Sequence, residues 1–157
     1  MAVRVQQEPF EAAAEIQALT RGRTDVGGVV TFTGLVRGDV AGRPLVSLTL
    51  EHYPGMTEAE LGRIEAEARV RFELLDCLVV HRVGSLQPGE EIVLVVTLSQ
   101  HRQAAFEAAE FLMDFLKTRA PFWKKETFAD GEGNWVDARD SDSAAQARWD
   151  GASAIQK

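Results

Sequence analysis

One segment in the second half of the chain constrains the fold most: an almost continuous apolar run followed by a long amphipathic stretch. Residues 91–98 are nearly all Ile, Val and Leu, which is typical of a strand buried on both faces of a sheet. Ser99 is suited to cap a helix, and apolar residues then recur at helical spacing until Pro121 ends the helix near Arg119. The pattern predicts a central strand with a helix packed against it.

The segments on either side alternate between helical and strand patterns. Helices are expected in residues 10–19 and from Thr57, in a capping-box pattern, to about Phe72. Strands are expected in residues 29–36, 45–51 and 77–83, and a terminal hairpin in residues 122–138. The apolar residues expected on one face of the second strand are Val46, Leu48 and Leu50. This order predicts an α+β fold, a mixed or antiparallel sheet with helices on one side.

The composition matches an ordinary globular protein. The 157 residues are 45% hydrophobic, enough for one domain with a core, and no apolar run approaches the roughly 20 residues that cross a bilayer. The N-terminus lacks the apolar core of a signal peptide, and Cys77 is the only cysteine, so no intrachain disulfide forms. We therefore expect a cytoplasmic protein.

Four cations gather in one short segment of a chain whose net charge is -7. Lys117, Arg119, Lys124 and Lys125 have no acid among them until Glu126. A small positive island on an acidic protein indicates a site for a discrete anion, whereas a nucleic-acid surface needs a broad basic face. Lys117 is expected at the seam of the core, partly desolvated. The alternative is that these cations only stabilise a helix C-terminus.

Two further places carry cations in positions suited to anions. His101 and Arg102 occupy the first turn of the third helix, where a cation is unfavourable unless it helps to hold a phosphate. Arg37 follows the first strand beside a glycine-bearing loop and could grip an oxyanion. Solvated or packed side chains are the alternative in each case.

Familiar catalytic motifs are missing from the sequence. The three histidines have no metal-ligand spacing, Cys77 reads as a buried small hydrophobe, and no nucleophile elbow, P-loop or dinucleotide fingerprint occurs. We expect no metal and no cofactor. Chemistry must then rest on lysine, arginine and histidine, or on a reactive group that a partner supplies.

Several strings, in order over residues 25–140, resemble one family, the large catalytic subunit of molybdopterin synthase. The matching strings are Val29 to Arg37, Leu48 to Thr57, His81 to Gly84, Pro88 to Val93, His101-Arg102 with Ala105 to Ala108, and Lys117 to Glu126. The resemblance implies an α/β hammerhead-type fold with about three main helices and a small antiparallel β subdomain. We expect one catalytic domain over residues 1–140. The residues after Arg139 are polar and alanine-rich, which predicts a tail over 141–157 that is helical or frayed.

The resemblance further implies a homodimer whose two ends each bind a small ubiquitin-like sulfur-carrier subunit, a heterotetramer. The C-terminal Gly-Gly of that partner, as a thiocarboxylate, delivers sulfur to cyclic pyranopterin monophosphate. Two rounds of this transfer form the dithiolene of molybdopterin, a step of molybdenum cofactor biosynthesis.

The family's residue roles carry over to matching positions of this chain. Lys117 and Lys124 are the expected catalytic residues, and His101 and Arg102 are expected to hold the phosphate from the other protomer. Substrate binding is assigned to Leu35, Val36, Arg37, His101, Arg102, Lys117, Lys124, Lys125 and Glu126. Phe32 and Met113 are expected to shape the pocket, and Arg139 to reach across the dimer. Leu35 stands where some relatives carry lysine.

Two other functions fit the basic island without catalysis. One is a module that docks a carboxylate-bearing peptide tail, which would tolerate Lys117→Arg. The other is a structural protein whose cations only cap helices.

Overall fold

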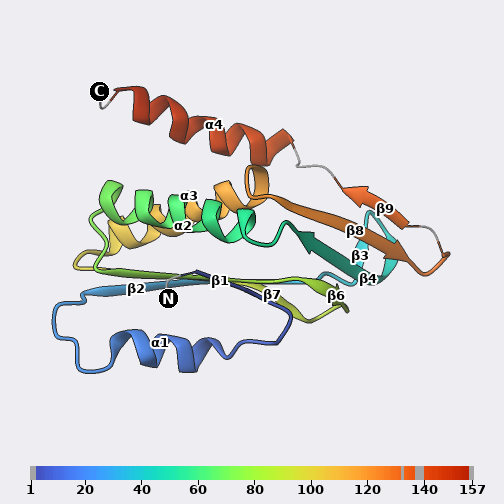
Figure 1. The fold of residues 1–157 in the computed structure, drawn as a ribbon, viewed down its shortest axis with the longest axis horizontal. Helices are drawn as coiled ribbons and strands as arrows, with labels where there is room; N and C mark the ends of the chain where they lie inside the picture. Colours follow the sequence, from blue (N-terminus) through green and yellow to red (C-terminus); the bar gives the residue numbers. More distant parts are fainter. Residues whose placement is uncertain (1–2, 132, 137–139, 156–157) are drawn as a thin grey trace.

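The computed structural model describes residues 3–131, 133–136 and 140–155 as four helices and nine strands (Figure 1). The helices are α1 (Ala12–Thr20), α2 (Met56–Arg71), α3 (Arg102–Thr118) and α4 (Asp140–Ile155). The strands are β1 (Val3–Gln6), β2 (Gly28–Leu35), β3 (Asp39–Val40), β4 (Arg43–His52), β5 (Asp76–Arg82), β6 (Gly84–Leu86), β7 (Glu91–Ser99), β8 (Phe122–Phe128) and β9 (Gly133–Val136). The α+β prediction is confirmed.

The first sheet is mixed and has the strand order β1-β5-β7-β2, with only the β1–β5 pair parallel. Strand β7 lies inside the sheet and is buried from Val93 to Ser99, as its apolar run predicts. Helix α1 covers one face, while α2 and α3 cover the other (Figure 1). Helices therefore lie on both faces, and the expectation of one helical side is wrong.

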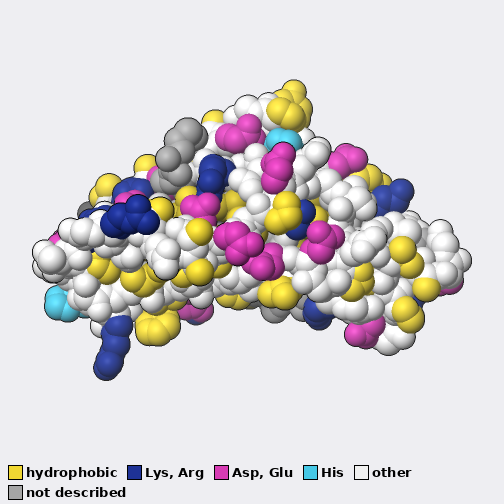
Figure 2. All heavy atoms as spheres, turned by 90° about the horizontal axis from the view of Figure 1, so that it is seen from below, with side chains coloured by type: hydrophobic (Ala, Val, Ile, Leu, Met, Phe, Trp, Pro, Cys, Tyr) yellow, Lys and Arg dark blue, Asp and Glu magenta, His cyan; other side chains and the backbone are white. Residues whose placement is uncertain are grey.

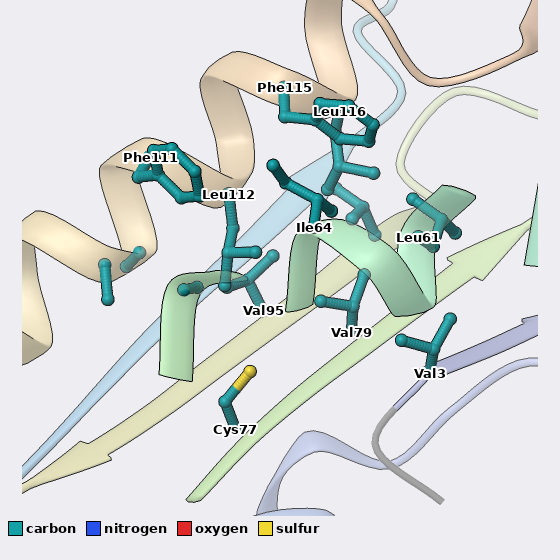
Figure 3. Close-up of a cluster of buried hydrophobic side chains, with 14 of the residues drawn as sticks. Val3, Leu61, Ile64, Cys77, Val79, Val95, Phe111, Leu112, Phe115 and Leu116 are labelled. Carbon is teal, nitrogen blue, oxygen red and sulfur yellow. The ribbon is translucent and has the colours of Figure 1, made fainter. Parts of the chain in front are cut away.

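The main core lies between the sheet and the helices α2 and α3. Figure 3 shows Leu61 and Ile64 of α2 and Leu112 of α3 lying over Val79 and Val95 of the sheet. The Phe111 ring of α3 packs edge-on against Phe72 at the end of α2. The helical spacing expected for α2 is confirmed, since Leu61, Ile64, Ala68 and Phe72 are all buried.

The second sheet is antiparallel and corresponds to the small β subdomain. Its order is β3-β4-β8-β9, and β6 also pairs with β4. The expected alternation in β4 is wrong at one position, because a register shift lies between Leu45 and Ser47. This bulge turns Leu45 into the core and leaves Val46 52% exposed, while Leu48 and Leu50 are buried as expected.

Both expected helix caps lie elsewhere. Helix α2 starts after Gly55, whose N–H donates to the Glu58 carboxylate at 3.0 Å. Thr57 lies inside the helix, fully buried, and its hydroxyl donates to the carbonyl of Pro121. Ser99 is the last residue of β7, and His101 takes the N-cap position of α3.

Helix α4, Asp140–Ile155, lies along α3 (Figure 1). Trp149 packs its ring edge-on against Phe72 and Phe111, at centroid distances of 5.7 and 5.5 Å. The sequence left open whether this segment is helical or frayed, and the structure shows a helix over Asp140–Ile155. No helix in the described part of the chain is long and apolar enough to span a membrane.

Candidate active site

Two connected hollows lie where the two sheets meet. The larger has a volume of about 720 Å³ and the smaller about 240 Å³. Both are lined by the end of β2, the last turn of α3 and the first half of β8. The residues common to both are Leu35, Arg37, Ile92, Leu116, Lys117 and Lys124. We call the pair of hollows the lysine cavity.

The two lysines expected to be catalytic both line this cavity. Lys117 comes from the last turn of α3, and Lys124 from the middle of β8. Lys117 is exposed at the cavity mouth, so its expected partial desolvation is wrong for this chain on its own. Lys124 is half-buried.

Strand alternation separates Lys124 from its neighbour. Lys125 lines neither hollow; its ammonium lies 6.0 Å from the ring centroid of Trp135 on the other face of β8. Glu126 returns to the cavity side and lines the larger hollow. The prediction that one lysine points inward and the other outward is therefore confirmed.

The segment after β2 supplies the opposite wall. Its backbone is fixed by two hydrogen bonds, from the Val36 N–H to the Glu90 carbonyl (2.9 Å) and from the Gly89 N–H to the Val36 carbonyl (2.8 Å). A register shift at Gly34 precedes it, where a Cβ would lie 2.8 Å from a methyl group of Val93. Arg37 thereby lines both hollows, while Val36 lines the larger.

The smaller hollow is closed by apolar side chains from three elements. Phe32 of β2 and Met113 of α3, the two residues expected to shape the pocket, both line it. Leu35, 55% exposed, lies at the boundary between the hollows.

A buried histidine that sequence reasoning left without a role also lines the smaller hollow. The His81 ring stacks on Phe122 with centroids 3.9 Å apart, and its Nδ1 lies 2.9 Å from the Arg82 carbonyl oxygen. Burial lowers the pKa of His81 to about 3; the hydrogen bond to Arg82 opposes this shift, and the charges of Lys124, Lys117 and His52 add to it. The imidazole is therefore neutral at ordinary pH.

The first turn of α3 is far from the lysine cavity. Fifteen residues separate Arg102 from Lys117 along the helix, roughly 22 Å at the rise of an α-helix. His101 and Arg102 are both exposed, and neither lines a hollow. Within one chain, this cation pair and the lysine cavity are not brought together. Arg139 lies outside the described residues.

Cys77 is not part of the site. It is 1% exposed in β5, and its thiol contacts the Glu65 carboxylate at 3.5 Å. Burial, reinforced by the charge of Glu65, raises the pKa of the thiol, which confirms a buried hydrophobe rather than a nucleophile. No group of three His, Cys, Asp or Glu side chains in the described ranges is placed to hold a metal ion.

Comparison with known proteins places the chain among its relatives. A family model described as MoaE protein matches residues 5–119. The molybdopterin synthase catalytic subunit of Mesorhizobium japonicum is 60% identical over 148 residues, which are 94% of this chain and 92% of that protein. The chain belongs to the MoaE family. It is thus an enzyme subunit, with the activity of a molybdopterin synthase catalytic subunit in molybdenum cofactor biosynthesis.

Solved structures of MoaE proteins share the fold. The molybdopterin biosynthesis MoaE protein from Burkholderia ambifaria has a TM-score of 0.80 and 49% identity, covering 95% of this chain and 98% of its own. The structure of molybdopterin synthase from Staphylococcus aureus has a TM-score of 0.77 and 32% identity, covering 84% and 94%. This membership in the MoaE family sets aside a non-catalytic function for the chain as a whole.

Proposed function

We propose that the lysine cavity transfers sulfur from the C-terminal thiocarboxylate of a small ubiquitin-like sulfur-carrier subunit to cyclic pyranopterin monophosphate. The observation that carries this proposal is the convergence of Arg37, Lys117 and Lys124 on one cavity of an acidic protein. The thiocarboxylate and the substrate phosphate are both anions, and three cations at one place favour their approach to each other.

The two hollows suit two reactants. An extended Gly-Gly tail would occupy the larger hollow, which runs along β8, and the pterin the smaller one with its apolar walls of Phe32 and Met113. Lys117 and Lys124 line both hollows and so would stand where the two reactants meet. Lys117 would stabilise the developing oxyanion or move a proton, and Lys124 would position or protonate the substrate. Glu126 and the Leu35–Val36 backbone would complete the walls.

A single-turnover assay tests this function. Protein is mixed with cyclic pyranopterin monophosphate and thiocarboxylated small subunit, and dithiolene product is quantified. Lys117→Ala should lower the rate roughly 100-fold or more, and Lys117→Arg should not restore it, because arginine keeps the charge but does not release a proton. Arg63→Ala, an exposed cation of α2, is the matched control. Full turnover by folded Lys117→Ala would contradict the role of this residue.

We further propose that the working unit is a homodimer carrying two small subunits. His101 and Arg102 lie too far from Lys117 to act in the same chain's cavity, and a two-fold partner would supply them as phosphate ligands. Exposed apolar side chains fit this: Phe32 on the edge strand β2 and Phe106 on α3 are 42% and 60% exposed and lie on the same side of the sheet. Arg139 and Lys125 are kept as candidate binding residues on the family resemblance alone.

Mixing two inactive variants tests the shared site. Arg102→Ala and Lys117→Ala homodimers should each be nearly inactive. Subunit exchange between them should restore about a quarter of the wild-type rate per subunit, because half of the chains enter mixed dimers and each mixed dimer has one intact site. Absence of any recovery, with exchange verified by mass, would place both residues in the same chain's site.

A domain over residues 1–140 and a cytoplasmic location stay predictions.

A further inference from the structure

His81 is the one buried titratable side chain of the lysine cavity that the proposed function leaves without a task. It is 5% exposed, yet it lines the smaller hollow together with Lys117 and Lys124. A histidine that only stabilises the fold would not need to line the cavity in which the proposed sulfur transfer takes place. The geometry of its ring limits what it can do there.

Two contacts set the tautomer and the orientation of the ring. Because a carbonyl oxygen only accepts, the 2.9 Å contact with Arg82 puts the hydrogen on Nδ1. The stacked ring of Phe122 prevents the imidazole from turning out of its plane. The remaining lone pair, on Nε2, is therefore presented as a fixed hydrogen-bond acceptor.

Strand β8 brings a donor to the same place. Phe122 and Lys124 are two residues apart and therefore lie on the same face of the strand. Because Phe122 stacks on His81, Lys124 lies on the face of β8 that is turned toward His81. Lys124 is also the charged group with the largest effect on the imidazole. A neutral acceptor among the cations Arg37, Lys117 and Lys124 can hold an ammonium without adding to the repulsion between them.

We infer that His81 is a positioning residue, whose Nε2 accepts a hydrogen bond from the Lys124 ammonium and aims it at the reacting substrate. The inference rests on the proposed sulfur transfer at this cavity. It assigns His81 no proton transfer of its own, because burial keeps the imidazole neutral at ordinary pH.

Two substitutions separate the two ring nitrogens. His81→Asn keeps a donor for the Arg82 carbonyl but removes the acceptor at the Nε2 position, whereas His81→Gln can place its amide oxygen there. In the single-turnover assay, His81→Asn should lower the rate roughly 10- to 100-fold, the range of one hydrogen bond to a charged group, with little change in substrate affinity. His81→Gln should recover most of the loss.

A double variant shows whether His81 acts through Lys124. In a Lys124→Ala background, His81→Asn should cause no further loss of rate; losses that multiply would overturn the inference by showing that His81 acts on the substrate directly. A wild-type rate in folded His81→Asn would also overturn it. Wild-type protein without product would instead refute the sulfur-transfer proposal itself.

A readout without turnover completes the test. The ¹⁵N NMR spectrum should show His81 as the Nδ1–H tautomer at pH 7, with an Nε2 signal that shifts when Lys124 is changed to Ala. An Nε2–H tautomer, or an Nε2 chemical shift that is the same in the wild type and in Lys124→Ala, would overturn the inference.

Discussion

For single residues on the strands of the candidate site, the face of the strand from which a side chain projects decides whether it lines the cavity. Lys124 lines the cavity, while Lys125 lies against Trp135 on the opposite face. His81 shares the cavity because the register of β5 turns it toward α3 and β8. Each of these assignments depends on one step of strand register, and a shift by one residue would exchange them.

The buried, neutral His81 makes stability depend on pH. Its pKa is about 6.5 when unfolded and about 3 when folded, so below pH 6.5 the unfolded chain binds a proton that the folded chain rejects. The free energy of unfolding should fall on acidification by up to about 1.4 kcal/mol per pH unit until the folded pKa is reached. Urea unfolding between pH 7 and 4 should show a shallower fall for His81→Gln. Parallel curves would contradict this.

Charge clustering singles out Lys117, because cations that gather on an acidic chain stand out in the sequence. Arg37 is singled out by its place after a strand and beside a glycine-bearing loop. The choice between Lys124 and Lys125 needed either the strand register or the family resemblance. His81 carries no such signal: its importance comes from burial and from Phe122, 41 positions later, stacking on it. A lone histidine in an apolar strand looks the same whether or not a cavity opens beside it.

At the scale of elements, the β4 bulge decides which side chains enter the core of the β subdomain. Simple alternation from sequence assigns Val46 to that core, because Leu45 and Val46 are both apolar and a bulge near the start of the strand leaves no trace in the pattern. Leu45→Ala should lower the free energy of unfolding by about 2–5 kcal/mol, whereas Val46→Ala should change it by less than about 1 kcal/mol. Denaturant titration of the two variants checks this, and the reverse order would mean that β4 is not bulged.

Thr57 joins the start of α2 to the start of β8, which carries Lys124. Its hydroxyl donates to the Pro121 carbonyl at 3.0 Å and accepts from the Tyr53 N–H at 2.9 Å. Thr57→Val keeps the shape but removes the hydrogen bonds to two partly buried backbone groups, and should cost about 1–3 kcal/mol of unfolding free energy and lower the rate of sulfur transfer. Thr57→Ser, which keeps the hydroxyl, is the control. Equal stability of both variants would show that the bonds contribute nothing.

At the scale of the whole molecule, α4 adds a layer over α3, although its polar, alanine-rich sequence hardly indicates packing. The signal lies in Trp149, whose indole N–H donates to Asp114 at 2.6 Å and whose carbonyl accepts from Arg71 at 3.0 Å. Trp149→Ala should lower the free energy of unfolding by about 2 kcal/mol, less than a fully buried tryptophan. Arg148→Ala removes ion pairs with Glu110 and Asp114 and the contact of its guanidinium with the Trp149 ring, and should cost less, about 1 kcal/mol. Thermal or urea unfolding of the two variants measures the difference, and equal losses would contradict the packing role of Trp149.

Phe122, the stacking partner of His81, packs against the core beneath α2 and α3 and also against the core of the β subdomain. The floor of the cavity is thus assembled from two hydrophobic cores whose residues alternate along the chain. A molecule in which either of these two cores has not yet formed lacks the floor of the cavity beneath Lys124. During refolding from denaturant, both binding of the carrier tail and sulfur transfer should therefore return only after both cores have formed.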